Sequence, residues 1–139
     1  MKRDNKAIGK RSSRKGKVYE RWVAGQLAEA LWPGAKRGIG QAREAGEVPD
    51  VDGTPYWIEA KHRKQLSVHA AYLQAVDAKA TNADPRPAMV VSRLDHTVRD
   101  AQGRVRPSVD LVTVSLGEWI KVVTELELLR AAFDRKTGE

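Results

Sequence analysis

The segment from Val48 to Lys61 constrains the fold of this chain more than any other. It contains two short apolar runs, at 48–52 and 56–61, that are typical of strands. The intervening Gly53-Thr54-Pro55 favours a turn. Two strands joined by so short a connection pair in the antiparallel direction. The sequence therefore predicts a β-hairpin here, around which the rest of the chain has to supply a sheet and a core.

The charged residues of this hairpin are expected on one face. Residues two apart on a strand share a face, so Glu59 and Lys61 point the same way. A four-residue loop places Asp50 opposite Glu59, whereas a two-residue loop places Asp50 opposite Trp57 and diagonal to Glu59. Both registers bring Asp50, Glu59 and Lys61 within about 8 Å of one another. Two carboxylates and a backbone carbonyl or water suit Mg²⁺ or Mn²⁺. The alternative is an exposed hairpin on which Lys61 simply pairs with an acid.

The remaining segments complete a pattern of helices and strands. The helices are predicted from helical periodicity, from Ser67 as an N-cap and from a capping box at Ser115 and Glu118. The strands are predicted from β-branched apolar runs. The expected order is α-β-β-β-α-β-β-α, an α/β or α+β domain with a central mixed sheet flanked by helices. The elements outside the hairpin are predicted at 17–31 (helix), 35–47 (short irregular strand and loop), 67–82 (helix), 88–92 and 109–115 (strands), and from 115 onward (helix).

Length and composition exclude several classes of protein. At 139 residues the chain forms one domain. The absence of cysteine excludes disulfides, thiolate zinc sites and cysteine nucleophiles. No window approaches the roughly 18 apolar residues of a membrane span, and the basic N-terminus lacks the apolar stretch of a signal peptide. We therefore expect a cytoplasmic protein.

The net charge of +7 is concentrated at the N-terminus. The first 17 residues carry eight basic residues and one acid, which equals the net charge of the whole chain. Because this stretch has almost no apolar content, we expect residues 1–16 to form an arm that is disordered when free, followed by a single domain over 17–139. Such an arm favours a polyanion such as the phosphate backbone of DNA. A solubilising tail is the alternative.

Glu20 occupies a position where the first helix should be apolar. At about 100° per residue, Glu20 is centred on the stripe that contains Leu27 and Leu31. An acid there costs desolvation free energy unless a cation compensates it, although an acid near a helix start also favours the helix dipole. Trp22 and Val18 lie on the far side of this helix and predict a second buried surface, formed by tail packing or by a subunit interface.

The spacing of Pro49-Asp50, eight residues and Glu59-Ala60-Lys61 resembles the signature of the PD-(D/E)XK nuclease superfamily. The order of elements is similar to that of the archaeal and phage-type Holliday-junction resolvases, with a basic arm, an acid on the first helix, and Arg37-Gly38 before the hairpin. The resemblance covers roughly residues 12–92 and implies a restriction-endonuclease-like core and a homodimer. The loop 93–108 is longer than this pattern, which bears on substrate preference.

The resemblance also implies roles for individual residues. Asp50 and Glu59 would hold Mg²⁺, for which Mn²⁺ can substitute, and Glu20 would ligate the ion or orient a water. Lys61 would hydrogen-bond the nucleophilic water or the charge that develops on the phosphate. Gln74 on the second helix would help to orient water, and a partly exposed helix residue is an equal interpretation. Contacts with DNA phosphates are implied for Arg11, Arg14, Lys15, Lys17 and Arg37.

The most concrete hypothesis is a Mg²⁺-dependent, structure-selective DNA endonuclease, a Holliday-junction resolvase that cuts four-way junctions as a homodimer. It would act at the nucleoid or in the cytoplasm of a phage-infected host. The alternatives are a nuclease of the same superfamily for flaps, nicks or duplex DNA, and a non-catalytic basic DNA-binding protein. Three acids facing a phosphate serve no purpose in binding alone, which favours an enzyme.

Overall fold

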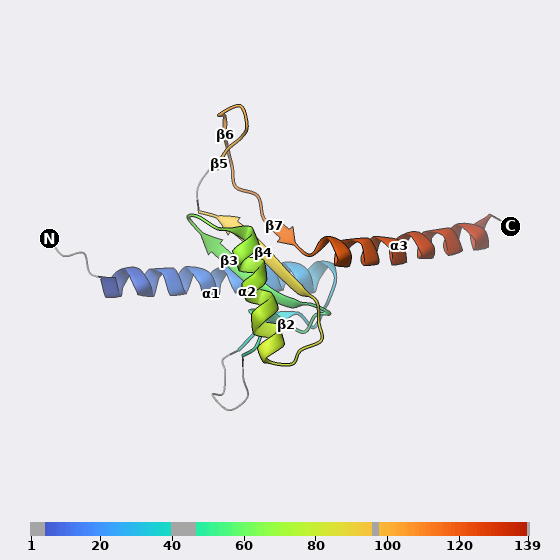
Figure 1. Ribbon diagram of the computed structural model, residues 1–139, viewed down its shortest axis with the longest axis horizontal. Coiled ribbons are helices and arrows are strands. Elements are labelled where there is room, and N and C mark those ends of the chain that lie inside the picture. Colours follow the sequence, from blue (N-terminus) through green and yellow to red (C-terminus); the bar gives the residue numbers. More distant parts are fainter. Residues whose placement is uncertain (1–4, 40–46, 96–97, 139) are drawn as a thin grey trace.

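A computed structural model describes residues 5–39, 47–95 and 98–138 (Figure 1). The predicted class, a mixed α/β fold, is confirmed, and two short strands lie within the link 93–108 that the predicted order does not contain. The described elements are α1 (Asn5–Ala30), β1 (Lys36–Arg37), β2 (Val51–Asp52), β3 (Trp57–Arg63), α2 (Val68–Thr81), β4 (Ala88–Leu94), β5 (Val98–Arg99), β6 (Val105–Arg106), β7 (Leu111–Thr113) and α3 (Leu116–Thr137).

Five of the described strands form one mixed sheet in the order β1-β2-β3-β4-β7. The central pair β3 and β4 is parallel, and each other neighbouring pair is antiparallel. Helix α2 forms the crossover between the two parallel strands. Helices α1 and α2 lie on opposite faces of the sheet, with α2 in front and α1 behind in Figure 1. The sheet is therefore a middle layer between two helices.

Alternate residues of β3 and β4 build the two halves of the core. On the α1 side, Ile58 packs with Tyr19 and Val23. On the α2 side, Trp57 packs against Ala71 and its neighbours, where small side chains allow the helix to approach the sheet closely. Trp57 and Ile58 are almost completely buried, so β3 is fixed from both faces. The side chains of Glu59 and Lys61, further along β3, are therefore carried by a strand that is packed on both faces.

Helix α1 begins well before the point that the sequence predicts. Residues 5–16, expected as part of a disordered arm, form its first turns, and residues 1–4 lie outside the described part of the chain. Five of these twelve residues are lysine or arginine, which have high helix propensity and extend a helix already anchored over 17–30, although the segment also contains two glycines and two serines. The predicted N-caps are confirmed: Ser67 accepts from the Ala70 N–H at 3.3 Å, and Ser115 accepts from the Glu118 N–H at 3.0 Å.

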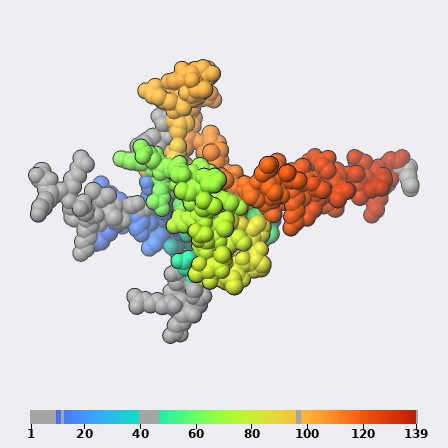
Figure 2. Space-filling model, in the orientation of Figure 1, coloured from blue at the N-terminus to red at the C-terminus, as the bar shows by residue number. Residues whose placement is uncertain are grey.

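Two segments extend away from this body (Figures 1 and 2). Strands β5 and β6 pair as a separate hairpin that projects from the sheet, with Gly103 in a left-handed conformation at its turn. Helix α3 extends from β7 in the opposite direction from the start of α1, and none of its described residues is buried. Among the described helices, none combines the length and the apolar character that crossing a membrane requires.

Candidate functional site

The candidate site lies at the edge of β3 where β2 diverges from it. Val51 pairs with Ile58, which is the register of the four-residue loop and places Asp50 across from Glu59. At the next residue of β3, where β2 no longer supplies a backbone partner, the Asp50 side chain does so: its Oδ2 accepts from the Ala60 N–H at 2.9 Å. The acid therefore satisfies the backbone of β3 while remaining at an open edge.

A glycine allows the preceding strand to approach this edge. The Gly38 N–H donates to the backbone carbonyl of Asp50 at 2.9 Å. A Cβ atom at Gly38 would collide with the carbonyl oxygen of Pro49. Only glycine therefore allows β1 to hold the backbone of Asp50 at this distance.

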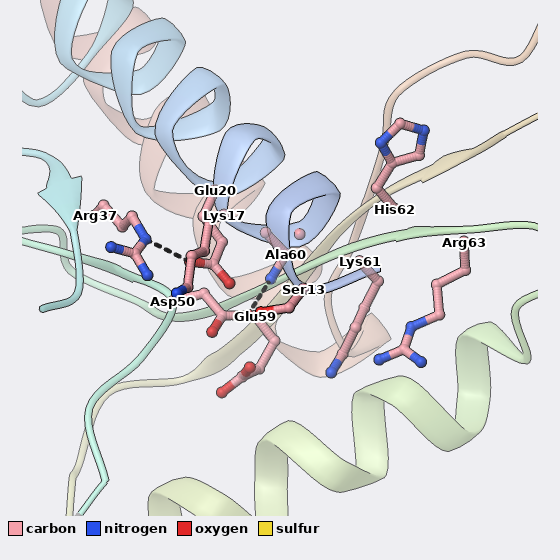
Figure 3. Close-up of a pocket in the computed structure, with 11 residues that line it drawn as sticks. Ser13, Lys17, Glu20, Arg37, Asp50, Glu59, Ala60, Lys61, His62 and Arg63 are labelled. Carbon is pink, nitrogen blue, oxygen red and sulfur yellow. Dashed lines mark hydrogen bonds and ion pairs between the residues drawn. The ribbon is translucent and has the colours of Figure 1, made fainter. Parts of the chain in front are cut away.

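A cavity of about 510 Å³ opens at this edge and brings together four of the residues predicted to take part in the chemistry (Figure 3). Glu20 enters from α1, Asp50 precedes β2, and Glu59 and Lys61 lie on β3. Figure 3 shows Glu59, Lys61 and Arg63 projecting from one side of β3, with Glu20 and Arg37 on the other side. The residues that line the cavity are Ser13, Gly16, Lys17, Glu20, Arg37, Asp50, Glu59, Ala60, Lys61, His62 and Arg63.

Burial and the neighbouring carboxylate raise the pKa of Glu59 to about 8. Burial is the larger cause, followed by the negative charge of Asp50 and a hydrogen bond between the two carboxyl groups. The Trp57 indole donates to Glu59 Oε1 at 2.9 Å and Lys61 lies near, and both lower the pKa only in part. Ionising both acids at this site is therefore unfavourable, and a bound cation would relieve the repulsion between the two carboxylates.

Glu20 has a partner that the sequence analysis did not anticipate. The Arg37 Nε donates to Glu20 Oε2 at 2.8 Å, and both side chains are largely shielded from solvent. Arg37, predicted to contact phosphate, therefore neutralises the acid predicted to assist the metal. Within the described residues, no three His, Cys, Asp or Glu side chains form a group that could hold a metal ion. The structure brings two carboxylates together, with Glu20 in the same cavity but ion-paired.

The donor set still fits a hard divalent cation. Asp50 and Glu59 offer carboxylate oxygens, which are the ligands that Mg²⁺ and Mn²⁺ prefer. Mg²⁺ is commonly held by one or two carboxylates while it retains several waters, so two acids suffice. Asp52, two residues from Asp50, is not a third donor, because Arg86 binds it at 2.8 Å and lowers its pKa.

Gln74 lies on the other side of the same carboxylate pair. It is an exposed residue of α2, and a second hollow of about 410 Å³ is lined by Gln74 together with Asp50 and Glu59. The helix thus places an amide within the surroundings of both acids, as the hypothesis of a water-orienting residue requires.

The predicted DNA contacts are divided between two cavities that lie on opposite faces of α1. Lys17 and Arg37 line the carboxylate cavity. Arg11, Arg14 and Lys15 line a different cavity on the other face. Arg63 was not predicted as a site residue, although the sequence carried the signal: Glu59, Lys61 and Arg63 follow one another at every second position and so share a face of β3.

A scan against protein-family models, a search of curated proteins and a search of solved structures found no match to this chain. The functional interpretation therefore rests on the residues and geometry described above.

Proposed function

We propose that the chain is a metal-dependent nuclease, and specifically a structure-selective DNA endonuclease of the Holliday-junction resolvase type with a restriction-endonuclease-like core. The observation that carries this proposal is the Asp50–Glu59 pair at an open strand edge, with Lys61 beside it, in a cavity whose other charged residues are mainly cationic. Beyond the Glu20–Arg37 ion pair, Lys17 and Arg63 add positive charge to this cavity, as contact with a phosphate backbone requires.

Under this proposal, the residues of the carboxylate cavity have separate roles in phosphodiester hydrolysis. Asp50 and Glu59 would hold Mg²⁺, whose chemistry is to activate water and to neutralise charge on the phosphate. Lys61 donates a hydrogen bond to the attacking water or to the oxygen on which negative charge develops. Water adds to phosphorus, one P–O ester bond breaks, and the proton passes to the departing oxygen. Lys17 and Arg63 would contact the phosphate backbone without reading bases, and Arg37 would hold Glu20 beside the site.

The decisive experiment compares wild-type protein with Glu59→Ala on a labelled four-way junction and a matched linear duplex, in Mg²⁺ and in EDTA. Glu29→Ala, an exposed acid on α1, is the control. Paired symmetric nicks on the junction alone, lost in EDTA and in Glu59→Ala, support the resolvase. Equal cutting of the duplex retains a nuclease and rejects junction selectivity. Binding without cleavage in Mg²⁺ or Mn²⁺ leaves only a DNA-binding protein.

We also propose that the protein acts as a homodimer paired through α3. Its apolar side chains repeat at alternating spacings of three and four, which is the pattern of a helix that packs against another helix. They are between 36% and 70% exposed, so the described residues of the same chain leave this apolar stripe largely uncovered. The stripe consists of Trp119, Val122, Leu126, Leu129 and Phe133.

Charge along α3 favours an antiparallel second copy as the partner. The half 116–127 carries three acids and one lysine, and the half 128–137 carries three basic residues and one acid. Antiparallel pairing places each acidic half against a basic half and forms one isologous contact. Leu126→Glu should convert the dimer to a monomer in sedimentation equilibrium, whereas Thr124→Glu, on the opposite face, should not. A wild-type monomer, or a dimer that survives Leu126→Glu, would reject this interface.

A further inference from the structure

A second cavity lies on the far face of α1 from the carboxylate site. It has a volume of about 380 Å³ and is lined by aromatic rings and cations. At about 100° per residue, its α1 residues lie roughly 180° around the helix from Glu20 and the other α1 residues of the carboxylate cavity. His62 on β3 borders both cavities, so they meet at this strand. None of the roles proposed above uses this cavity as a unit.

The floor of this cavity is a fixed aromatic surface. The rings of Tyr19 and Trp22 are nearly parallel, with an interplanar angle of 11° and centroids 6.0 Å apart. The Arg93 guanidinium lies 5.0 Å from the Tyr19 ring centroid and 4.4 Å from that of Trp22. Asp110 holds Arg93 through two hydrogen bonds of 2.8 and 3.0 Å and accepts from the Tyr19 hydroxyl at 2.8 Å. Tyr19 is buried, but Trp22 remains 41% exposed.

The rim of the cavity is positively charged. Lys15 is ion-paired with Asp95 at 2.6 Å, and Asp95 also binds His62 at 2.9 Å. Arg11 and Arg14 are exposed and form no ion pair with another described residue. No described residue thus forms an ion pair with these two guanidinium groups, which lie in the same cavity as an exposed indole. This combination of a flat aromatic surface and adjacent cations matches a nucleotide, whose base stacks and whose phosphate carries charge.

We propose that this cavity binds an unpaired nucleotide of the substrate, with the base on Trp22 and the adjoining phosphates on Arg11 and Arg14. The inference rests on the proposed function and specifies its substrate class. A strand in the carboxylate cavity and a strand in this cavity pass on opposite faces of α1, so the two strands must diverge around the helix. Branched DNA with a single-stranded or opened segment satisfies this geometry, and continuous duplex does not.

The test is equilibrium binding in EDTA, measured by fluorescence anisotropy, so that cleavage does not intervene. Three labelled probes are compared: a single strand, a blunt duplex, and a forked duplex with two single-stranded tails. Trp22→Ala should weaken binding of the single strand and the fork by about 10-fold or more, while binding of the blunt duplex changes by less than about twofold. Leu31→Ala, another exposed apolar residue at the end of α1, is the control and should change none of them.

A second variant removes charge from Arg11 and Arg14, which form no ion pair with another described residue. Like Trp22→Ala, the variant Arg11→Gln/Arg14→Gln should lose affinity for the single strand and the fork but not for the blunt duplex. Its affinity should also depend less steeply on salt concentration. Arg104→Gln/Arg106→Gln on the β5–β6 hairpin is the charge-matched control. The proposal would be overturned if a cavity variant lost affinity equally for all three probes, or if neither cavity variant lost affinity for any of them. A change in oligomeric state with Trp22→Ala would also overturn it.

The result is separable from that of the endonuclease test. If no DNA is cut in Mg²⁺ or Mn²⁺ but Trp22→Ala selectively weakens single-strand binding, the cavity stands and the catalytic function fails. If cleavage requires Glu59 but Trp22→Ala binds every probe like wild type, the catalytic function stands and the cavity proposal fails.

Discussion

Replacing Glu59 with glutamine should make the metal-free protein more stable, and the gain should grow with pH. Burial and the charge of Asp50 raise the pKa of Glu59 from its ordinary 4.5 to about 8. The folded state therefore retains the Glu59 proton to higher pH than the unfolded state, so the free energy of unfolding falls as pH rises between about 4.5 and about 8. Glutamine resembles the protonated acid and carries no charge to desolvate.

The structure sets the size of this effect. Each pKa unit corresponds to about 1.36 kcal/mol, so the full shift can lower the free energy of unfolding of wild type by at most roughly 5 kcal/mol. Roughly 3 kcal/mol of this decrease falls between pH 5.5 and pH 8.5. Water entry and side-chain movement reduce that figure, and we expect Glu59→Gln to gain about 1–3 kcal/mol over wild type across this interval. The amide oxygen can still accept from the Trp57 indole, now 2.9 Å from Glu59 Oε1, and the amide N–H can donate to Asp50.

The assay is urea unfolding followed by far-ultraviolet circular dichroism, in EDTA, at one protein concentration and at both pH values. Comparing the variant with wild type at each pH removes the contribution of titrating groups that do not interact with Glu59. Glu29→Gln, an exposed acid on α1, should differ from wild type by less than about 0.5 kcal/mol at either pH. The reasoning is refuted if Glu59→Gln is less stable than wild type at pH 8.5, or if its advantage is the same at both pH values.

Three further predictions concern the same site. Mg²⁺ should raise the Tm of wild type more at pH 8.5 than at pH 6, because the ion must displace the Glu59 proton; calorimetry should show no such rise in Glu59→Gln, and an equal rise would place the ion elsewhere. Lys61→Gln should slow single-turnover cleavage by about 100-fold while the Mg²⁺-dependent rise in Tm remains, and an unchanged rate would remove Lys61 from the chemistry. Gly38→Ala should cost about 1–3 kcal/mol in urea unfolding, because its Cβ meets the Pro49 carbonyl, whereas Gly25→Ala, with open space around it, should gain about 0.5–1 kcal/mol.

The pairing of the two acids could be predicted from sequence because it depends on strand parity alone. Asp50 and Glu59 fall on the same face in either hairpin register. The register itself depends on the chemistry of the loop. The Thr54 hydroxyl accepts from the Tyr56 N–H at 3.1 Å and donates to the Tyr56 carbonyl at 3.0 Å, which keeps Tyr56 in the loop. Gly53 turns the chain at φ +75°, and these contacts produce the four-residue connection.

Contacts between residues far apart in the chain could not be predicted in this way. The ion pair of Glu20 with Arg37 and the stacking of Arg93 on Trp22 each join different elements, so no local periodicity encodes them. Helical spacing located an apolar stripe on α3 but did not say which surface covers it. The exposed position of Leu126 shows that the sheet of the same chain does not.

The shortness of β2 links stability to the proposed chemistry. A longer β2 would continue the ladder past Val51 and pair the Ala60 N–H with a backbone carbonyl, but it would also cover the edge of β3 that a phosphate would approach under the proposed function. Asp50 satisfies that N–H with a side chain instead, and so leaves the edge open. The consequence is a carboxylate beside Glu59, which raises the pKa of Glu59 and destabilises the metal-free fold at neutral pH. A neutral residue in place of either acid would remove this cost from the metal-free fold, and under the proposed function the positive charge of a bound cation would offset it.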